Sequence, residues 1–288
     1  EHGIGSEIAD AAIREADQNF GRLLSWMQDT GVARETDVFV VSDHGYSTII
    51  DTVDVEALVR DAGFKTGTES GGVFVAPNGG SVLFYTHRED RPTIDRLAAW
   101  LMQQPWCGTI VASEVMGSIT GTLPARLIGS EGPRVPDLAI SFRWDQKPNS
   151  TGSIGRVYST DGASGQGQHG SMSRQEIQNV LVARGPSFKQ GIVVKSPSGN
   201  IDLAATILHI LKLPPTENTD GRVLKEALND GPSYDSLKWS TKVHSADREV
   251  KGGLYRQHIK VSTIGSTTYI DEGHASLNEP SQPSPVRP

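Results

Sequence analysis

The residues in this sequence best suited to chemistry are an aspartate and a histidine that follow one another directly. Asp43 and His44 come after the apolar run Val38–Val41, and Gly45 follows them. Carboxylate oxygens and imidazole nitrogens are ligands for zinc and similar divalent ions. A glycine at position 45 lets the backbone turn sharply, so that neighbouring side chains can converge. An isolated pair also has an ordinary explanation, a turn-capping aspartate beside a histidine that binds nothing, since a metal site needs several convergent groups.

A second histidine lies between near-neighbour glycines. His169 belongs to the segment GQHGS at 167–171, inside the polar stretch 145–173, which is rich in Gly and Ser. Glycines next to a ligand let it approach a metal without side-chain crowding. We predict no regular structure in this stretch, and a structureless segment of that length in a compact domain is usually functional or mobile. Taken alone, His169 is better explained as a solvent-exposed loop residue.

Together, the order of these motifs resembles the alkaline phosphatase superfamily, and within it the nucleotide pyrophosphatase/phosphodiesterase branch. The resemblance covers most of residues 1–230 and implies an alkaline-phosphatase-like α/β fold. Its matching segments are VFVVSDHG at 38–45, HGSMS at 169–173, NVLVARGPSFK at 179–189, NIDLAATILHIL at 200–211, LPP at 213–215 and DGR at 220–222.

The resemblance implies a metal-dependent hydrolase of phosphate esters, most nearly a phosphodiesterase or nucleotide pyrophosphatase. Asp43 and His44 would bind one of two divalent ions, with zinc expected, and His169 would bind the other. Two ions about 4 Å apart can hold the attacking and leaving oxygens of an in-line displacement at phosphorus. The family nucleophile is a Thr or Ser that forms a covalent phospho-enzyme. Tyr46, next to the metal motif, could stack on a nucleobase in the substrate, or could simply pack under the turn.

The sequence departs from the family pattern at its start. The family places a metal-binding Asp and His, four residues apart, ahead of the first helix, and its nucleophile and one more Asp lie further upstream. Counted back from Gly3, that ligand His falls immediately before Glu1, and His2 takes a position that is not a ligand. We therefore expect the Thr or Ser nucleophile upstream of Glu1 and regard this chain, which has no initiator Met, as the C-terminal part of a longer enzyme. With three of six expected ligands it should bind metal weakly and be inactive alone.

Two alternatives stay open at this point. The shared ligands do not separate a phosphodiesterase from a phosphomonoesterase, phosphonate hydrolase or sulfatase of the same superfamily, because leaving-group selection depends on pocket residues. From a different class of protein, the chain could be a non-catalytic interaction module that retains the fold, an alternative that the absent nucleophile favours.

The elements that must position the site alternate between helices and strands. Apolar residues every three to four positions predict a helix from Ser6 to Asp29 with one buried stripe. The stripe consists of Ile8, Ala12, Ala16, Phe20, Leu23, Leu24 and Met27. The continuous apolar run at 38–41 predicts a strand buried on both faces, as in a parallel sheet, and ligands bind beyond the C-terminal ends of such strands. Further strands at 81–86, 109–112, 137–143 and 179–183, with helices at 54–62, 91–104 and 201–212, predict a mainly parallel sheet flanked by helices.

The sequence changes character near its end. Strands at Tyr255–Val261 and Thr267–Ile270, joined through Gly265-Ser266, predict a small β-hairpin tail. We therefore divide the chain into the C-terminal part of an alkaline-phosphatase-like catalytic domain (1–234), a β-hairpin appendage (235–278) and a disordered Pro-rich tail (279–288).

Composition restricts the partners. The chain has 288 residues, a formal net charge of -7 and a pI near 5.6, which argues against binding of nucleic-acid polymers. Its single cysteine excludes an internal disulfide framework and a four-thiolate zinc site. No apolar run approaches the roughly 20 residues of a membrane span. The expected partner is a small phosphate-ester substrate, with compartment and oligomeric state left open.

Overall fold

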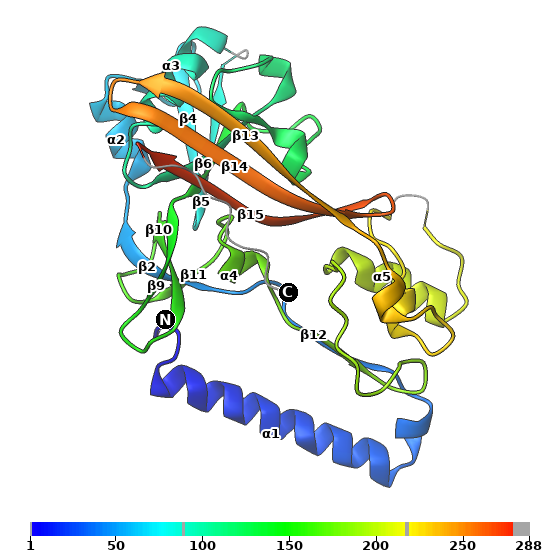
Figure 1. Cartoon of the computed structure of the whole chain (residues 1–288). Helices are drawn as coiled ribbons and strands as arrows, with labels where there is room; N and C mark the ends of the chain where they lie inside the picture. The colour runs from blue at the N-terminus through cyan, green and yellow to red at the C-terminus, as the bar shows by residue number, and fades with distance from the viewer. Residues whose placement is uncertain (1, 88–89, 217–218, 279–288) are drawn as a thin grey trace.

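A computed structural model describes residues 2–87, 90–216 and 219–278 of the protein (Figure 1), so the predicted tail at 279–288 lies outside the described residues. The helices are α1 (Glu7–Asp29), α2 (Val55–Asp61), α3 (Arg91–Leu101), α4 (Arg174–Ile177) and α5 (Ile201–Ile210). The strands are β1 (Val38–Val41), β2 (Ser47–Thr52), β3 (Lys65–Thr66), β4 (Gly72–Asn78), β5 (Ser81–Thr86), β6 (Cys107–Ala112), β7 (Leu123–Pro124), β8 (Leu138–Phe142), β9 (Trp144–Pro148), β10 (Ile154–Ser159), β11 (Gly167–Gln168), β12 (Leu181–Arg184), β13 (Ser240–Val250), β14 (Gly253–Ile264) and β15 (Thr267–Leu277).

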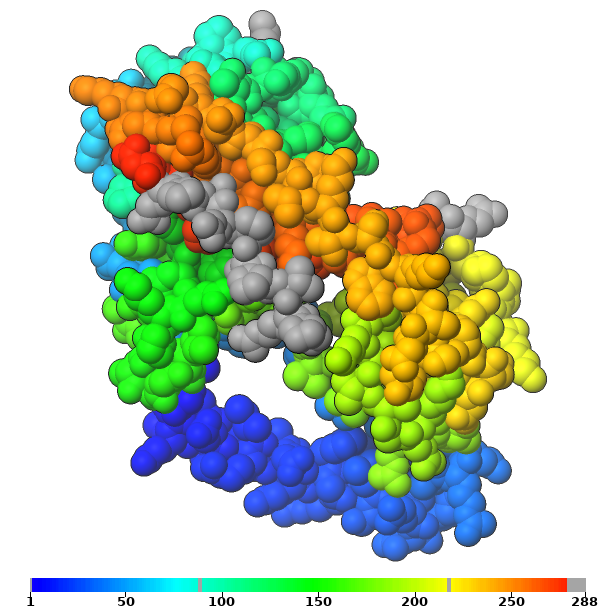
Figure 2. Space-filling model, in the orientation of Figure 1, coloured from blue at the N-terminus to red at the C-terminus, as the bar shows by residue number. Residues whose placement is uncertain are grey.

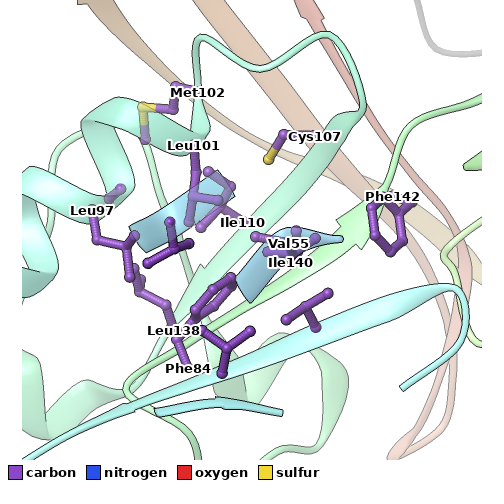
Figure 3. Close-up of a cluster of buried hydrophobic side chains, with 14 of the residues drawn as sticks. Val55, Phe84, Leu97, Leu101, Met102, Cys107, Ile110, Leu138, Ile140 and Phe142 are labelled. Carbon is purple, nitrogen blue, oxygen red and sulfur yellow. The ribbon is translucent and has the colours of Figure 1, made fainter. Parts of the chain in front are cut away.

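The main hydrophobic core lies on a sheet with the strand order β3-β4-β5-β8-β6-β7. Apolar side chains of α2 and α3 pack onto this sheet, and Leu97, Leu101, Phe84 and Ile140 are among those with almost no solvent exposure (Figure 3). Burial of such side chains is the main source of stability in a domain of this size. The mixed α/β class predicted from the sequence is confirmed.

The predicted mainly parallel arrangement is wrong. In the described part of the chain three of the eleven strand pairs are parallel, namely β2–β10, β3–β4 and β6–β7, and the others are antiparallel. Short connections explain four of the antiparallel pairs, β4–β5, β9–β10, β13–β14 and β14–β15, whose strands follow one another directly in the chain. β4 and β5, for example, are joined by the two residues Gly79 and Gly80, and a two-residue link can join only antiparallel neighbours.

The first helix forms where the sequence predicts it, but its apolar stripe is largely uncovered. The Ser6 hydroxyl accepts a hydrogen bond from Ala9 N at 3.2 Å, as expected of an N-cap. Of the predicted buried stripe only Met27 is buried, whereas Ile8 and Leu23 are 57% and 48% exposed. Figure 2 shows open space between the middle of α1 and the body of the molecule. The prediction of a buried stripe is therefore wrong within the described residues.

Anchors at both ends hold this helix. Before its N-terminus, the carbonyl of Ile4 accepts hydrogen bonds from the side chains of Asn149 and Thr151, in the loop that joins β9 to β10. Beyond its C-terminus, Asp37 accepts hydrogen bonds from the backbone and hydroxyl of Ser187, just after β12. The helix thus connects two distant parts of the structure while its middle faces solvent.

Strand β1 also differs from its prediction. It pairs antiparallel with β12 in a two-stranded sheet. Val40 and Val41 are 38% and 44% exposed rather than buried on both faces. The predicted burial fails because no third strand pairs with β1 in the described ranges, so this sheet has only two strands.

The stretch 145–173 is more ordered than predicted. It contains β9, β10 and β11, which join β2 in a four-stranded sheet with the order β11-β2-β10-β9. Short β11 runs antiparallel to β2, with Gln168 opposite Ser47. This pairing places the residue after β11, His169, beside the segment that precedes β2.

The predicted C-terminal hairpin is present and is longer than expected. β14 and β15 pair antiparallel, and β13 adds a third strand. Tyr255 and Ala275 belong to the same buried cluster as α3, and the Tyr255 hydroxyl donates to the carbonyl of Gly108 at 2.6 Å. The fully buried Gln257 side chain bonds both the N–H and the carbonyl of Ile110. The three-stranded sheet is thereby packed into the main core, while the division of the chain into domains stays a prediction.

Candidate metal centre

The structure brings together three side chains that the sequence predicts as metal ligands. Asp43 and His44 follow β1, and His169 follows β11, whose pairing with β2 carries it to the same place. The rings of His44 and His169 stack with centroids 3.9 Å apart and planes inclined by 24°. Nε2 of His44 lies 3.4 Å from Oδ2 of Asp43. Two segments far apart in the chain thus present their polar side chains to one small region.

Tyr46 completes this cluster of rings. Its ring meets that of His44 edge to face at 5.1 Å and that of His169 at 5.6 Å. The side chain is 51% exposed, so it is accessible rather than packed under the turn. An exposed aromatic face beside a polar cluster can take a flat ring by stacking.

The orientation of His44 leaves one ring nitrogen available. Nδ1 lies 2.8 Å from the carbonyl oxygen of Gly45. Because a carbonyl only accepts, Nδ1 must carry the proton in this hydrogen bond, and the lone pair of the neutral ring is then on Nε2. A backbone carbonyl that fixes the tautomer in this way is a common support for metal-binding histidines.

These donors do not make a complete metal site by themselves. In the described part of the chain no group of three or more His, Cys, Asp or Glu side chains is placed to hold a metal ion. The planes of the two stacked rings are nearly parallel, so the in-plane lone pairs of His44 and His169 do not converge on one shared ion. Catalytic zinc ordinarily has three protein ligands, and three donors that do not converge on one ion leave every ion with fewer than that.

Two asparagines that the sequence did not single out fix the loop that carries Asp43. Nδ2 of Asn179 donates to the carbonyl of Ser42 at 2.7 Å, and Nδ2 of Asn200 donates to that of Asp43 at 2.9 Å. The N–H of His44 donates to Oδ1 of Asp43 at 3.0 Å. Asn200 carries a local signal as a helix N-cap, but its side chain does not cap α5 and holds the metal-motif backbone instead.

Helix α4 packs closely against the same loop. Gly45 N donates to the carbonyl of Glu176 at 2.7 Å. A Cβ at position 45 would come within 2.6 Å of the carbonyl oxygen of Gln178 and still closer to that of Gln175. Glycine is therefore required here by the close approach of two backbones.

The carboxyl group of Glu176 reaches the other loop. Its Oε2 accepts a hydrogen bond from Ser171 N at 2.7 Å, and the residue is 2% exposed. Burial raises the pKa of Glu176, while the nearby hydroxyls of Ser47 and Ser171, the N–H of Ser171 and His44 oppose that rise. Sequence reasoning missed this residue because nothing in its local pattern marks it as buried.

Comparison with known proteins adds the family. The model of the type I phosphodiesterase / nucleotide pyrophosphatase family matches residues 1–172, more than half of the chain. The chain belongs to this family. The match to the type I phosphodiesterase / nucleotide pyrophosphatase family ends just past His169 and so includes all three predicted ligands. The resemblance found in the sequence is confirmed.

The chain is also similar in sequence to a curated protein of this kind. An ectonucleotide pyrophosphatase/phosphodiesterase of Caenorhabditis elegans is 23% identical over 238 residues, which is 80% of this chain and 27% of that protein. The chain thus spans about a quarter of the length of this relative. No solved structure matches the chain. None of the helices in the described ranges has the length and apolar character needed to cross a membrane.

Proposed function

We propose that this chain forms part of the active site of a metal-dependent phosphodiesterase or nucleotide pyrophosphatase with an alkaline-phosphatase-like fold. The observation that carries the proposal is the convergence of Asp43 and His44 with His169 from two separate segments. Membership of a hydrolase family with this activity supports it.

In this proposal the ligands are divided between two divalent ions, with zinc expected at both positions. Asp43 and His44 hold one ion and His169 holds the other. The parallel stacking of the two rings supports this division, because their nitrogens do not converge on a single point. Bound ions would supply electrophilic stabilisation of the phosphoryl oxygens. Further ligands and a Thr or Ser nucleophile are needed to complete the site, so the chain alone should bind zinc weakly.

The substrate is a small phosphate ester, and we place a flat group of that substrate, such as a nucleobase, against Tyr46. Its half-exposed ring beside the ligand cluster supports that placement. The choice between a diester and a monoester or sulfate ester depends on residues beyond this cluster, and we favour the diester because the matching family is one of phosphodiesterases.

A zinc titration of histidine-labelled protein tests the proposal. With ¹³C in the histidine rings, millimolar Zn²⁺ should shift the His44 and His169 resonances and leave that of His244, on β13, in place. His44→Ala and His169→Ala should each remove part of the response, and His244→Ala should remove none of it. If Zn²⁺ leaves both ligand resonances unmoved, the metal proposal is wrong. Sustained turnover of bis-p-nitrophenyl phosphate by the pure chain would contradict the expected incompleteness of the site.

A further inference from the structure

Helix α4 is a single turn that lies between the two loops that carry the predicted ligands. We infer that Glu176 on this turn is a positioning residue, which holds the 43–45 loop and the 169–171 loop in register so that His44 and His169 stack. The functional meaning of this inference rests on the function proposed above, since it assigns a role to Glu176 only if those histidines are ligands.

The backbone of Glu176 holds the first loop. Its carbonyl accepts the Gly45 N–H at 2.7 Å, directly after His44. The close approach of Gln175 and Gln178 to Gly45 leaves no room for a Cβ between them. The loop therefore cannot move away from α4 without losing this contact, and it cannot move closer.

The side chain of Glu176 holds the second loop. Oε2 accepts the N–H of Ser171, two residues after His169, at 2.7 Å. A further link crosses between the segments, since Ser47 Oγ donates to Ser173 Oγ at 3.0 Å. One residue thus contacts both ligand-bearing loops, with its main chain on one side and its carboxyl group on the other.

The burial of this carboxyl group indicates more than a packing role. Glu176 is 2% exposed, and Oε1 has no hydrogen-bond partner in the described part of the chain. A buried and only partly satisfied carboxyl group carries a desolvation penalty, and such groups in folded proteins call for an explanation. A place beside two ligand loops supplies one, because outer groups that orient metal ligands are a regular feature of metal sites.

Helix α4 is also held by an ion pair to strand β15 of the C-terminal sheet. Arg174 Nη2 lies 2.9 Å from Oε2 of Glu272 on β15, and their side chains are 16% and 1% exposed. Glu176 is therefore held on the C-terminal three-stranded sheet and does not simply follow the loops. This anchoring makes it a support for the two histidines.

The contact between the two rings can be measured directly. In protein with ¹³C-labelled histidine rings, His44 and His169 should show a ring-to-ring NOE. Glu176→Ala should abolish this NOE, and Glu176→Gln should restore it, because the amide oxygen can still accept from Ser171. Glu226→Ala is the matched control: Glu226 is 1% exposed and hydrogen-bonded, so its loss should lower the melting temperature and leave the NOE unchanged.

The outcomes separate this inference from the proposed function. An NOE that persists in folded Glu176→Ala protein would overturn the positioning role. If Glu176→Ala does not fold, Glu176→Asp gives the same test, since it withdraws the carboxyl group by one methylene and should weaken the NOE. Zn²⁺ added to the same wild-type sample tests the ligands. If the histidine resonances do not shift with Zn²⁺ while the NOE still depends on Glu176, the metal function is refuted and the positioning role stands.

Discussion

Replacement of Gly45 by alanine should disrupt the contact between the metal-motif loop and α4. The new Cβ would lie 2.6 Å from the carbonyl oxygen of Gln178, where ordinary contact begins at 3.4 Å. The backbones must therefore separate by about 0.8 Å, and more on the side of Gln175. Both obstacles are main-chain atoms, so no side chain can rotate away to relieve the overlap.

The cost has two parts. Overpacking of a tight site costs typically about 1–3 kcal/mol. The hydrogen bond from Gly45 N to Glu176 would lengthen from 2.7 Å beyond useful range, and its loss adds roughly 1 kcal/mol. We expect a total near 2–4 kcal/mol, which corresponds to a fall of about 5–15 °C in melting temperature for a protein of this size.

Thermal unfolding followed by circular dichroism measures this effect, and Gly21→Ala is the matched control. Gly21 lies inside α1, and a Cβ there meets nothing within 4 Å. The control should be neutral or more stable than the wild type by up to about 1 kcal/mol, because alanine favours a helix. A Gly45→Ala protein that melts with the wild type would refute the close approach on which the site geometry depends.

Three further predictions concern other parts of the chain. Asn179→Ala and Asn200→Ala should each cost roughly 1 kcal/mol and accelerate amide exchange in the 42–45 loop, as followed by mass spectrometry; unchanged exchange there would contradict the loop support. Although burial opposes it, the hydrogen bonds from Arg222 hold the pKa of Glu226 below its ordinary value, so the stability that its charge contributes is present above about pH 4.5 and is lost as the pH falls through the lowered pKa. The stability difference between wild type and Glu226→Gln should accordingly shrink on acidification. A difference that grows would contradict the lowered pKa of Glu226. Burial raises the pKa of the Cys107 thiol to about 12, so this thiol should react with a disulfide reagent near pH 8 only after unfolding, and rapid reaction of the native protein would show the core to be open.

Local signals in the sequence predicted the elements but not what covers them. The cap at Ser6 and the spacing of apolar residues place α1 correctly, because capping and periodicity are properties of neighbouring residues. The same spacing says only that one face of the helix is apolar, and the exposure of Ile8 and Leu23 shows that a stripe need not find a cover within the described chain. The orientation of the strands was mispredicted because pairing depends on connections such as the tight link between β4 and β5.

The candidate site likewise contains residues that the sequence predicts and residues that it does not. Asp43, His44 and His169 could be named in advance because their residue types and motif order carry the information. Glu176 and Asn179 could not, since each acts through hydrogen bonds to backbone groups of the loops that carry the predicted ligands. Such a partner has no sequence pattern, because any residue can offer a carbonyl or an N–H.

Helix α1 sets the distance between its two anchors, the β9–β10 loop and the segment after β12. Its 23 residues span about 34 Å at 1.5 Å per residue, and each residue also turns the chain by about 100°. The chain is hydrogen-bonded to other segments at Ile4, before this helix, and at Asp37, beyond it, so a substitution in the exposed middle of α1 should change little beyond the local surface. A single inserted or deleted residue would rotate one end of α1 by about 100° relative to the other, so the structure depends more on the length of this helix than on the identity of its exposed residues.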